Sequence, residues 1–372
     1  MAHAYTPGLR VTERAVVRKE RRLPLKGDVL VARGDTVSAR TIVARTLLPG
    51  NIQTVNLASS LGIEPNEVAG KLLHPIGTAV EAGAPIAETR ALFGLMKSKA
   101  TAPAAGTIES VSDVTGQLIL REPPIPVEID AFLAGTVVEV LPGDGVVVES
   151  PAAFVQGIFG IGGEVHGALV TAVAGPDDEL TPERLSSAHE GKIVIGGSYV
   201  SHAVLKAAIR LGVRGVVVGG FDDRDLRDLL GYDLGVAITG QESLGLTLVL
   251  TEGFGRIKMA DRTFHLLRKL EGMEAAVSGA TQIRAGVMRP EIVVPLGGSA
   301  GSSGEGQVTG MDVGSLLRCI RGEHFGRIGR IVALPAPLTE LGSESHARVL
   351  EAELDGIGRV ILPRANIELI EA

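Results

Sequence analysis

The sequence predicts a multidomain protein in which a central α/β layer, built on a mostly parallel sheet, lies between β-rich domains at the two ends. Three observations predict this fold class. Residues 20–160 alternate apolar and polar side chains between Gly and Asp turns, which is typical of short half-buried strands. Residues 192–218 contain two continuous Val/Ile runs around a helical segment, which indicates a βαβ unit. Residues 316–372 return to short apolar strands after a Gly/Ser-rich stretch.

The composition indicates a globular chain with several cores. Its 372 residues are enough for two or three domains, and 45% of them are hydrophobic whereas 21% are charged. No apolar run is long enough to span a membrane, and the first residues lack the apolar stretch of a signal peptide. Cys319 is the only cysteine, which excludes an internal disulfide. We therefore expect a cytoplasmic protein with no membrane partner.

The charge is distributed unevenly along the chain. Residues 1–50 hold ten Lys or Arg and four acids, a net charge of +6, whereas the whole chain carries −7. A basic N-terminal arm, residues 1–19, is therefore expected to dock on a polyanion or on an acidic partner. The alternative is a solvated basic face beside acidic neighbours of the same chain.

The first domain, residues 20–160, is expected to consist almost entirely of strands and turns. Turns are predicted at Gly27–Asp28 and at Gly34–Asp35, where Gly supplies the backbone angles that a tight turn needs. Residues 52–73 differ, because a strand is followed by an amphipathic helix with a cap near Glu64–Pro65.

Three phrases of this domain resemble the barrel-sandwich hybrid fold, and they are Gly27–Val37, Gly77–Glu88 and Ala102–Val111. That fold is shared by biotinyl and lipoyl carrier domains, by periplasmic adaptor proteins, and by parts of RNA polymerase and Rnf-type electron-transfer subunits. The resemblance implies a flattened barrel of two sheets with tight turns at regular spacing.

Carrier domains of this family present a lysine, in a Met-Lys-Met setting, on an exposed hairpin. Here Lys97 and Lys99 lie nine and seven residues before Gly106, which is closer than in the carriers, and Leu95 occupies the matching place. The spacing argues against covalently bound biotin or lipoate, and no cofactor is predicted. A solvent-facing hairpin is the alternative.

The second domain, residues 161–295, is expected to be the α/β layer. Strand and helix signals alternate along it, and buried parallel strands are typically continuous Val/Ile runs. The expected strands are residues 192–195, 213–218, 234–240 and 244–255, and the expected helices start near Ser201 and cover residues 222–233 and 259–272.

The ends of these strands predict a crevice for a small anionic ligand. Ligands of open parallel sheets bind beyond the carboxyl ends of the strands, where Gly permits close approach and helix N-termini offer free N–H groups. Short loops of this kind also need Gly for their own geometry, which is the alternative. The ligand-binding candidates at the strand ends are Gly196, Gly197, Ser198, Gly219, Gly220, Thr239, Glu242 and Thr251.

Two arginines beside a later strand are further candidates for holding an anion or a carboxylate. They are Arg284 and Arg289, at a turn that ends in Pro290. The alternative for these arginines is a salt bridge to Glu252 or Glu291.

Residues 196–213 also resemble the phosphohistidine signature of phosphoenolpyruvate-utilising enzymes. Ser201, His202 and Ala203 match that signature residue for residue, while one residue is added on each side of His202. The resemblance implies a histidine that carries phosphate, because a neutral imidazole is a good nucleophile. A helix-start histidine capped by Ser201 is the alternative. The candidate catalytic residues are His202, Ser201 and Glu252, and no metal site is predicted because the histidines are scattered singly.

A Gly/Ser-rich linker, residues 296–315, leads to a last domain at residues 316–372. Gly326–Gly329 before an apolar strand, an Asp355–Gly356 turn and a final strand of the form Asn-x-Glu-x-Ile resemble the KOW motif. The resemblance implies an SH3-like barrel that contacts RNA or protein. This domain carries a net charge of −1, which favours protein over RNA. The candidates for gripping RNA or a partner are Arg318, Arg321, Arg327 and Arg330.

Three functions remain open from the sequence. The leading hypothesis is a non-catalytic cytoplasmic scaffold or adaptor that binds other proteins through its terminal β-barrels and holds a small ligand in the α/β domain. The first alternative is a phosphohistidine-type carrier or an enzyme that uses His202. The second alternative is an RNA- or transcription-associated factor that uses the KOW-like barrel and the basic arm.

Overall fold

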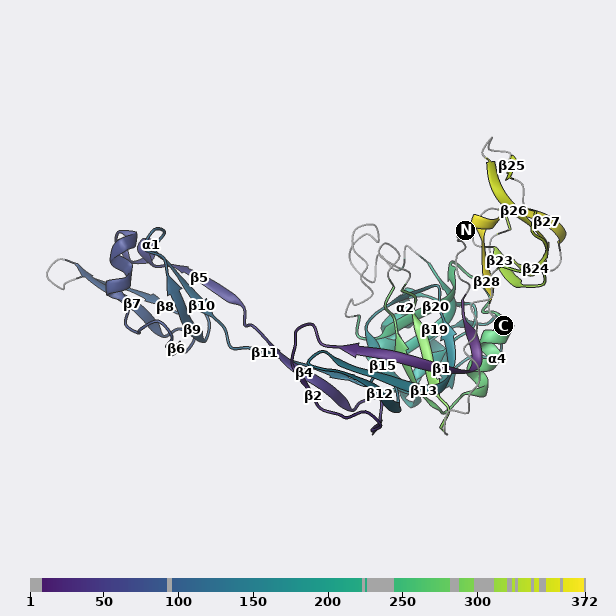
Figure 1. Ribbon diagram of the computed structural model, residues 1–372, viewed down its shortest axis with the longest axis horizontal. Helices are drawn as coiled ribbons and strands as arrows, with labels where there is room; N and C mark the ends of the chain where they lie inside the picture. The colour runs from purple at the N-terminus through teal and green to yellow at the C-terminus, as the bar shows by residue number, and fades with distance from the viewer. Residues whose placement is uncertain are drawn as a thin grey trace.

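The chain is mostly β, with 50% strand, 14% helix and several separate sheets. Figure 1 shows a lobe that contains β5 to β10, a central body, and a C-terminal module that contains β23 to β28. In the part of the chain that is described, no helix is long and apolar enough to cross a membrane. The computed structural model describes residues 9–91, 96–222, 225, 244–281, 288–297, 311–319, 323–324, 327–335, 338–340, 346–354 and 357–370.

The body is built on one mixed sheet of 13 strands. Its main path runs in the order β14-β20-β19-β17-β15-β21-β22-β13-β12-β3, while β1 pairs with β13, β16 with β18, and β18 with β19. The strands are β1 (Val11–Arg22), β3 (Thr36–Val37), β12 (Gly135–Leu141), β13 (Gly145–Gln156), β14 (Phe159–Ile161), β15 (Glu164–Thr171), β16 (Glu179–Leu180), β17 (Ile193–Ile195), β18 (Tyr199–Val200), β19 (Gly215–Phe221), β20 (Thr247–Phe254), β21 (Glu274–Ser278) and β22 (Glu291–Pro295).

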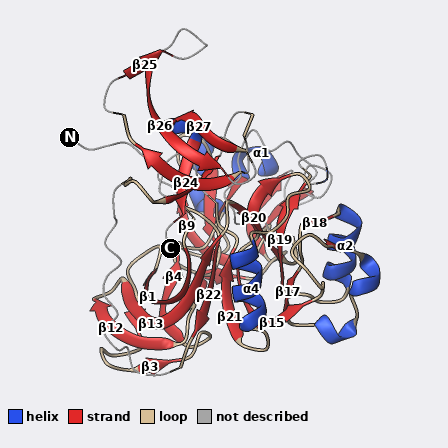
Figure 2. Cartoon of the chain, turned by 90° about the vertical axis from the view of Figure 1, so that its right-hand side faces the viewer, coloured by secondary structure: helices blue, strands red, loops and turns tan. Residues whose placement is uncertain are grey.

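The βαβ prediction is confirmed within this sheet. Parallel pairing joins β15 to β17, β17 to β19 and β19 to β20, and it also joins β16 to β18 and β18 to β19. α2 (His202–Arg210) connects β18 to β19, and α4 (Asp261–Lys269) connects β20 to β21. Figure 2 shows α2 on the flank of the body beside β17 and β18. The side chains of Val216–Val218 are fully buried, as expected for a strand covered on both faces.

Two of the expected elements of this region lie outside the described residues. They are the strand at residues 234–240 and the helix at residues 222–233, of which only Asp222 and Asp225 are described. Two short 3-10 helices, Pro182–Arg184 and Ser187–His189, precede β17.

β1 contains much of the segment that was expected to be a basic arm. It pairs with β13 along its length, from Val11 opposite Val155 to Arg22 opposite Gly145. Val11 and Val17 are buried in the cores of the body. The segment is therefore a strand of the sheet, because burial of these valines offsets the cost of ordering it.

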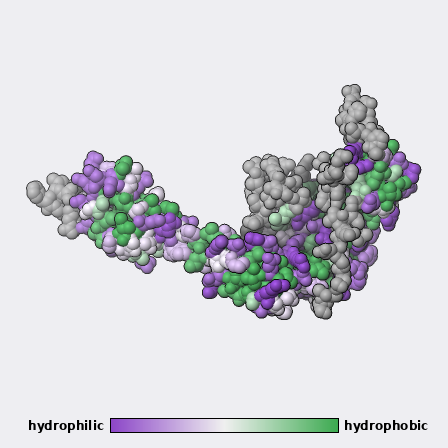
Figure 3. Space-filling model, in the orientation of Figure 1, coloured by the Kyte–Doolittle hydropathy of each residue, from purple (hydrophilic) through white to green (hydrophobic). Residues whose placement is uncertain are grey.

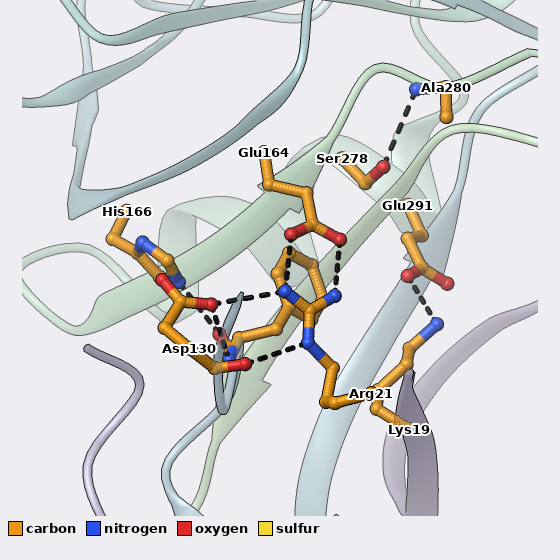
Figure 4. A network of polar contacts seen from close by, with 9 residues as sticks. Lys19, Arg21, Asp130, Glu164, His166, Ser278, Ala280 and Glu291 are labelled. Atoms are coloured by element: carbon orange, nitrogen blue, oxygen red, sulfur yellow. Dashed lines mark hydrogen bonds and ion pairs between the residues drawn. The ribbon is translucent and has the colours of Figure 1, made fainter. Parts of the chain in front are cut away.

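Charged side chains also fix β1 on the body (Figure 4). Arg21 donates two hydrogen bonds to the carboxylate of Glu164, both at 2.7 Å, and a third to Oδ1 of Asp130 at 3.1 Å. Lys19 forms an ion pair with Glu291 of β22. The acids of the body thus neutralise the basic face of this strand.

The expected domain boundary near residue 160 does not coincide with the edge of a sheet. β12 and β13 belong to the same sheet as β21 and β22, and Phe154, Ala276 and Val293 share one core. β13 is 12 residues long, and it pairs first with β12 and then with β22. Local periodicity does not reveal such a shared strand, because β22 lies far beyond β13 in the sequence.

The lobe is inserted between β4 (Ile42–Leu48) and β11 (Ile125–Asp130). These strands pair from Leu48 opposite Ile125 to Ile42 opposite Asp130, and they form a ribbon that joins the lobe to the body (Figure 1). β2 (Asp28–Val29) pairs with β4. The elements of the lobe are β5 (Ile52–Asn56), α1 (Leu57–Leu61), the 3-10 helix η1 (Pro65–Lys71), β6 (Ala79–Val80), β7 (Pro85–Ala91), β8 (Met96–Thr101), β9 (Gly106–Val111) and β10 (Gln117–Arg121).

The helix expected in residues 52–73 is divided into two short helices. Asn56 caps α1, because its side chain accepts a hydrogen bond from the backbone N–H of Ser59 at 3.0 Å. Gly62 ends α1 with a left-handed conformation at φ +66°. Pro65 then begins η1, since Pro fits the first position of a helix.

The C-terminal module is an antiparallel sheet in the order β25-β26-β24-β23-β28, with β27 paired to β26. Its own core contains Leu317, Cys319 and Leu350. Of the expected linker, Met311–Ser315 belong to this module, because the Gly314 N–H donates to the Ile331 carbonyl oxygen at 2.8 Å, whereas the Leu296 N–H donates to the Pro151 carbonyl oxygen of the body, also at 2.8 Å. The elements are β23 (Leu316–Cys319), β24 (Ile328–Ala333), β25 (Leu338–Glu340), β26 (His346–Leu354), β27 (Gly358–Pro363), the 3-10 helix Arg364–Asn366 and β28 (Ile367–Ile370).

Candidate functional site

The glycines at the ends of the parallel strands are packed against backbone groups of the body. A Cβ atom on Gly197 would lie 2.3 Å from the carbonyl oxygen of Asp178, and one on Gly219 would lie 2.1 Å from that of Ile257. A Cβ atom on Gly220 would also meet a backbone carbonyl oxygen, that of Gly255, whereas one on Gly196 would meet the side chains of Val218 and Leu180. The absence of a side chain at these positions therefore lets neighbouring segments of the protein pack closely, which fits the alternative in which the glycines serve the geometry of the fold.

The polar side chains expected at the same strand ends bond to backbone carbonyls. The Ser198 hydroxyl donates to the Asp177 carbonyl oxygen at 2.7 Å, and the Thr251 hydroxyl donates to that of Val218 at 3.3 Å. Three further candidates, Thr239, Glu242 and Arg284, lie outside the described residues.

His202 begins α2, as expected, but Ser201 does not cap the helix with its side chain. The carboxylate of Asp225 accepts the backbone N–H of His202 at 3.0 Å and therefore caps the helix from another segment. Nε2 of His202 is covered from solvent and has no hydrogen-bond partner among the described residues. A phosphocarrier transfers phosphate through an accessible imidazole nitrogen, and Nε2 is not accessible in this arrangement.

Two carboxylates, those of Asp222 and Asp225, lie near Tyr199 and the start of α2. The Tyr199 hydroxyl lies 3.5 Å from Oδ2 of Asp225, and the guanidinium of Arg256 lies 4.4 Å from the centre of the Tyr199 ring. Burial raises the pKa of Tyr199, and the carboxylates of Asp225 and Asp222 raise it further. This end of the sheet holds a neutral tyrosine beneath an arginine.

Four buried charges meet where the C-terminal module touches the body. Arg318 of β23 donates from Nε to Oε1 of Glu368 of β28 at 2.6 Å, and its Nη1 is paired with Glu252 of β20. Arg289, which precedes β22, donates to Oε2 of Glu368 at 3.3 Å. Oε1 of Glu252 also accepts the backbone N–H of Ala260 at 3.0 Å.

The four side chains of this ion cluster, Glu252, Arg289, Arg318 and Glu368, are almost fully buried. The side chains of Glu368, Arg318, Glu252 and Arg289 are 1%, 7%, 8% and 11% exposed. The body and the module each contribute one arginine and one glutamate, so every charge has an opposite partner and the sum is zero. Buried charges are tolerated when they are paired and hydrogen-bonded in this way.

The ion cluster changes the roles expected for three residues. Glu252 is committed to Arg318 and to the backbone at Ala260, rather than being free for catalysis. Arg289 pairs with Glu368, a partner that the sequence did not indicate.

Arg318 is buried at this junction, rather than exposed in a loop that grips RNA. Arg327 and Arg330 are exposed, and Arg330 donates to the Gly314 carbonyl oxygen at 3.2 Å. Arg321 lies outside the described residues.

A cavity of about 220 Å³ adjoins the ion cluster. Thr251, Glu252, Arg318 and Glu368 form its polar side, together with the first turn of α4 at residues 260–263. Its apolar side combines two residues of the body with two of the module, which are Leu9, Val11, Leu316 and Ile328. Of these lining residues, the sequence singled out Thr251 and Glu252, at one strand end of the α/β domain, and Arg318, in the C-terminal domain.

A wider groove of about 660 Å³ lies beside β3, β12 and β21. It is lined mainly by small apolar residues, and its two acids are already partnered. Glu149 accepts from Arg18 at 2.6 Å, and Glu274 accepts from Arg40 at 3.3 Å. These pairs also support the alternative interpretation of the basic N-terminal segment, in which its charges face acidic neighbours.

In comparisons with known proteins, no family model and no curated protein matches this chain. The function is therefore argued from the arrangement of the described residues. Among the sequence candidates, the structure brings Thr251, Glu252, Arg289 and Arg318 together, and it adds Glu368 to them.

Proposed function

We propose that the protein is a non-catalytic cytoplasmic scaffold or adaptor. The lobe and the C-terminal module bind other proteins, and the cavity between the module and the body holds a small ligand. The observation that carries this proposal is that the lobe and the C-terminal module, the two outer parts of the protein, each have a core of their own and join the body through narrow connections. The lobe joins through the ribbon of β4 and β11, and the module through the ion cluster.

Exposed apolar side chains on both outer parts support the proposal, since protein partners cover such residues in the centre of an interface. On the lobe, Leu73 and Ile76 are 45% and 58% exposed. On the module, Val313 and Ile361 are both 63% exposed. Figure 3 shows hydrophobic residues on the surface of the lobe among hydrophilic ones.

The side chains expected to carry out chemistry also support a non-catalytic role. Glu252 holds the module on the body, and Nε2 of His202 is covered. The resemblance of residues 20–160 to the barrel-sandwich hybrid and of residues 316–372 to the KOW motif fits the proposal, because modules of both kinds occur in larger assemblies.

Quantitative affinity purification of the tagged full-length chain from its source cells, read by mass spectrometry, tests the proposal. We expect wild type to enrich a defined set of proteins, and the Leu73→Glu/Ile76→Glu variant to lose at least one of them by tenfold or more. Leu30→Glu is the matched control, because Leu30 is similarly exposed, at 44%, but lies outside the lobe. Equal enrichment by all three forms, or no enriched protein, would contradict the proposal. Circular dichroism checks that each variant is folded.

A further inference from the structure

Resting on the proposed function, we propose that the outer face of α2 and the adjoining edge of the sheet form a docking surface for an acidic segment of a partner protein. Four basic residues form this surface, the basic patch, and they are Lys192, Lys206, Arg210 and Arg214. The inference adds to the scaffold proposal a third surface and the chemistry of the partner that it holds.

The fold brings the basic patch together at one edge of the body. Lys192 and Arg214 directly precede the parallel strands β17 and β19, and the Arg214 N–H donates to the Lys192 carbonyl oxygen at 2.9 Å. Because β18 and β19 are parallel, α2 runs back to the start of β19, and it ends at Arg210, four residues before Arg214. Lys206 lies one helical turn before Arg210.

The four side chains are open to a partner. Those of Lys206, Arg210 and Arg214 are exposed, and that of Lys192 is half-buried. Figure 2 shows α2 at the outside of the body, on the side away from β3 and β12. The buried residues of α2 hold the helix on the sheet, so its basic face points outward.

The cations of the basic patch have no acidic partners in the described part of the protein. Residues 191–221 contain these four bases and no acid, in a chain with 43 acids. None of the four forms an ion pair with any residue that the structure describes. The bases of β1 differ, since Arg18, Lys19 and Arg21 are all paired with acids of the body.

Neighbouring charges reduce the positive charge of the basic patch only in part. Glu190 lies beside the turn that follows α2, because a Cβ atom on Gly212 would be 3.3 Å from its Cγ. The 3-10 helix Pro182–Arg184, which contacts α2, contributes one acid and one base. Four bases and the carboxylate of Glu190 leave a net charge of +3 on a protein whose sum is −7.

The spacing within α2 is unfavourable for the helix alone. Like charges four residues apart on a helix repel each other, and Lys206 and Arg210 are such a pair. The C-terminal end of the helix dipole stabilises Arg210 in the last turn, but it acts little on Lys206, which lies a turn earlier. Carboxylates of a bound partner remove this repulsion.

The surroundings favour a protein partner over RNA or a membrane. RNA without base pairs binds through aromatic rings on which its bases stack, and the rings nearest in sequence, Tyr199 and Phe221, are only 8% and 0% exposed. Binding in a membrane surface requires apolar side chains beside the basic ones, and the described residues 163–222 include no exposed large hydrophobic side chain. Acidic side chains of a protein need neither feature, because opposite charge is sufficient to bring the two surfaces together.

Fluorescence anisotropy of the full chain with a labelled peptide of ten glutamates, at about 50 mM salt, tests the proposal. We expect the peptide to bind, to dissociate as salt is added, and to bind the Lys206→Gln/Arg210→Gln variant at least fivefold more weakly. Lys26→Gln/Arg33→Gln is the matched control. It removes the same charge from two exposed bases outside the basic patch that also form no ion pair with described residues, so it should bind the peptide like wild type.

No binding of the peptide at millimolar concentration, or equal affinities for the three folded forms, would overturn the proposal. Two further probes test the class of partner, and they are a single-stranded RNA of ten uridines and vesicles that contain phosphatidylserine. Tighter binding of either one than of the peptide, lost in Lys206→Gln/Arg210→Gln, would also overturn it. Partners of the lobe are measured separately by affinity purification, so failure of the basic patch leaves the scaffold proposal standing if those partners are found.

Discussion

Replacing Arg318 by Met is expected to destabilise the C-terminal module strongly. The substitution leaves the carboxylates of Glu252 and Glu368 buried, with the Ala260 N–H and Arg289 as their remaining partners. Removing one partner of a buried ion pair costs about 3–5 kcal/mol, because the other charge stays buried without compensation. The side chains of Arg318, Glu252 and Glu368 are 7%, 8% and 1% exposed, which places the cluster in that class.

The thiol of Cys319 can be used to measure the opening of the module, so no cysteine has to be introduced. It follows Arg318 on β23, so its side chain points to the opposite face, into the core of the module, where it is 1% exposed. Burial raises the pKa of its thiol. A disulfide reagent therefore reacts only when the module opens. A cost of about 3–5 kcal/mol corresponds to an increase in the labelling rate of roughly two to four powers of ten.

Arg121→Met is the matched control, because Arg121 pairs with Glu109 on the lobe, where the two side chains are 35% and 42% exposed. An exposed ion pair contributes about 0.2–1 kcal/mol to stability. The Arg121–Glu109 pair also lies far from the module, so the labelling rate of Cys319 in this variant should stay close to that of wild type. The double variant Arg318→Met/Glu252→Gln should lose less than the sum of its single variants, since the two residues interact. A labelling rate for Arg318→Met within threefold of wild type would refute the reasoning.

Three further predictions concern the body and its surface. Gly219→Ala should lower the free energy of unfolding by about 1–3 kcal/mol in urea denaturation, because its Cβ would lie 2.1 Å from the Ile257 carbonyl oxygen. Gly70→Ala, with no atom within 4 Å of its Cβ, should change it by less than about 0.5 kcal/mol. The raised pKa of Tyr199 means that the folded protein keeps a proton that the unfolded chain loses, so stability should fall as pH rises above about 10. Tyr199→Phe should show a smaller fall, and an unchanged fall would disprove the assignment. RNA binding, measured by filter retention, should weaken by less than tenfold between about 50 and 200 mM salt, because Arg18, Lys19 and Arg21 of β1 are paired with acids of the body. A loss of a hundredfold or more would contradict that pairing.

Local patterns were sufficient to predict the elements that bury a continuous or periodic apolar face. The Val/Ile run of β19 is fully buried, and α4 begins and ends within the expected residues 259–272. The pattern was less informative where one residue ends an element. In residues 52–73 the apolar spacing continues across Gly62, whose left-handed conformation stops α1 after five residues.

The candidate site was predicted in pieces but not as a whole. Thr251 and Glu252 were expected at a strand end, Arg289 as an anion holder and Arg318 in an exposed loop, and nothing in the sequence connects them to Glu368. A strand pattern indicates that a side chain faces inward or outward. It does not identify the residue that it faces, since that depends on how distant segments pack.

The sequence by itself therefore determined which segments form strands and helices in the parallel part of the body, because hydrophobic periodicity acts over a few residues. It also determined that acids outnumber bases beyond the N-terminal segment, so that partners for the basic strand exist. Only the tertiary structure decided that β1 lies in the sheet, that backbone carbonyl groups pack against Gly197, Gly219 and Gly220, and that two arginines and two glutamates meet beside a cavity. The physical reason is that a buried charge is stable only beside an opposite charge, and tertiary packing brings that partner from a distant part of the chain.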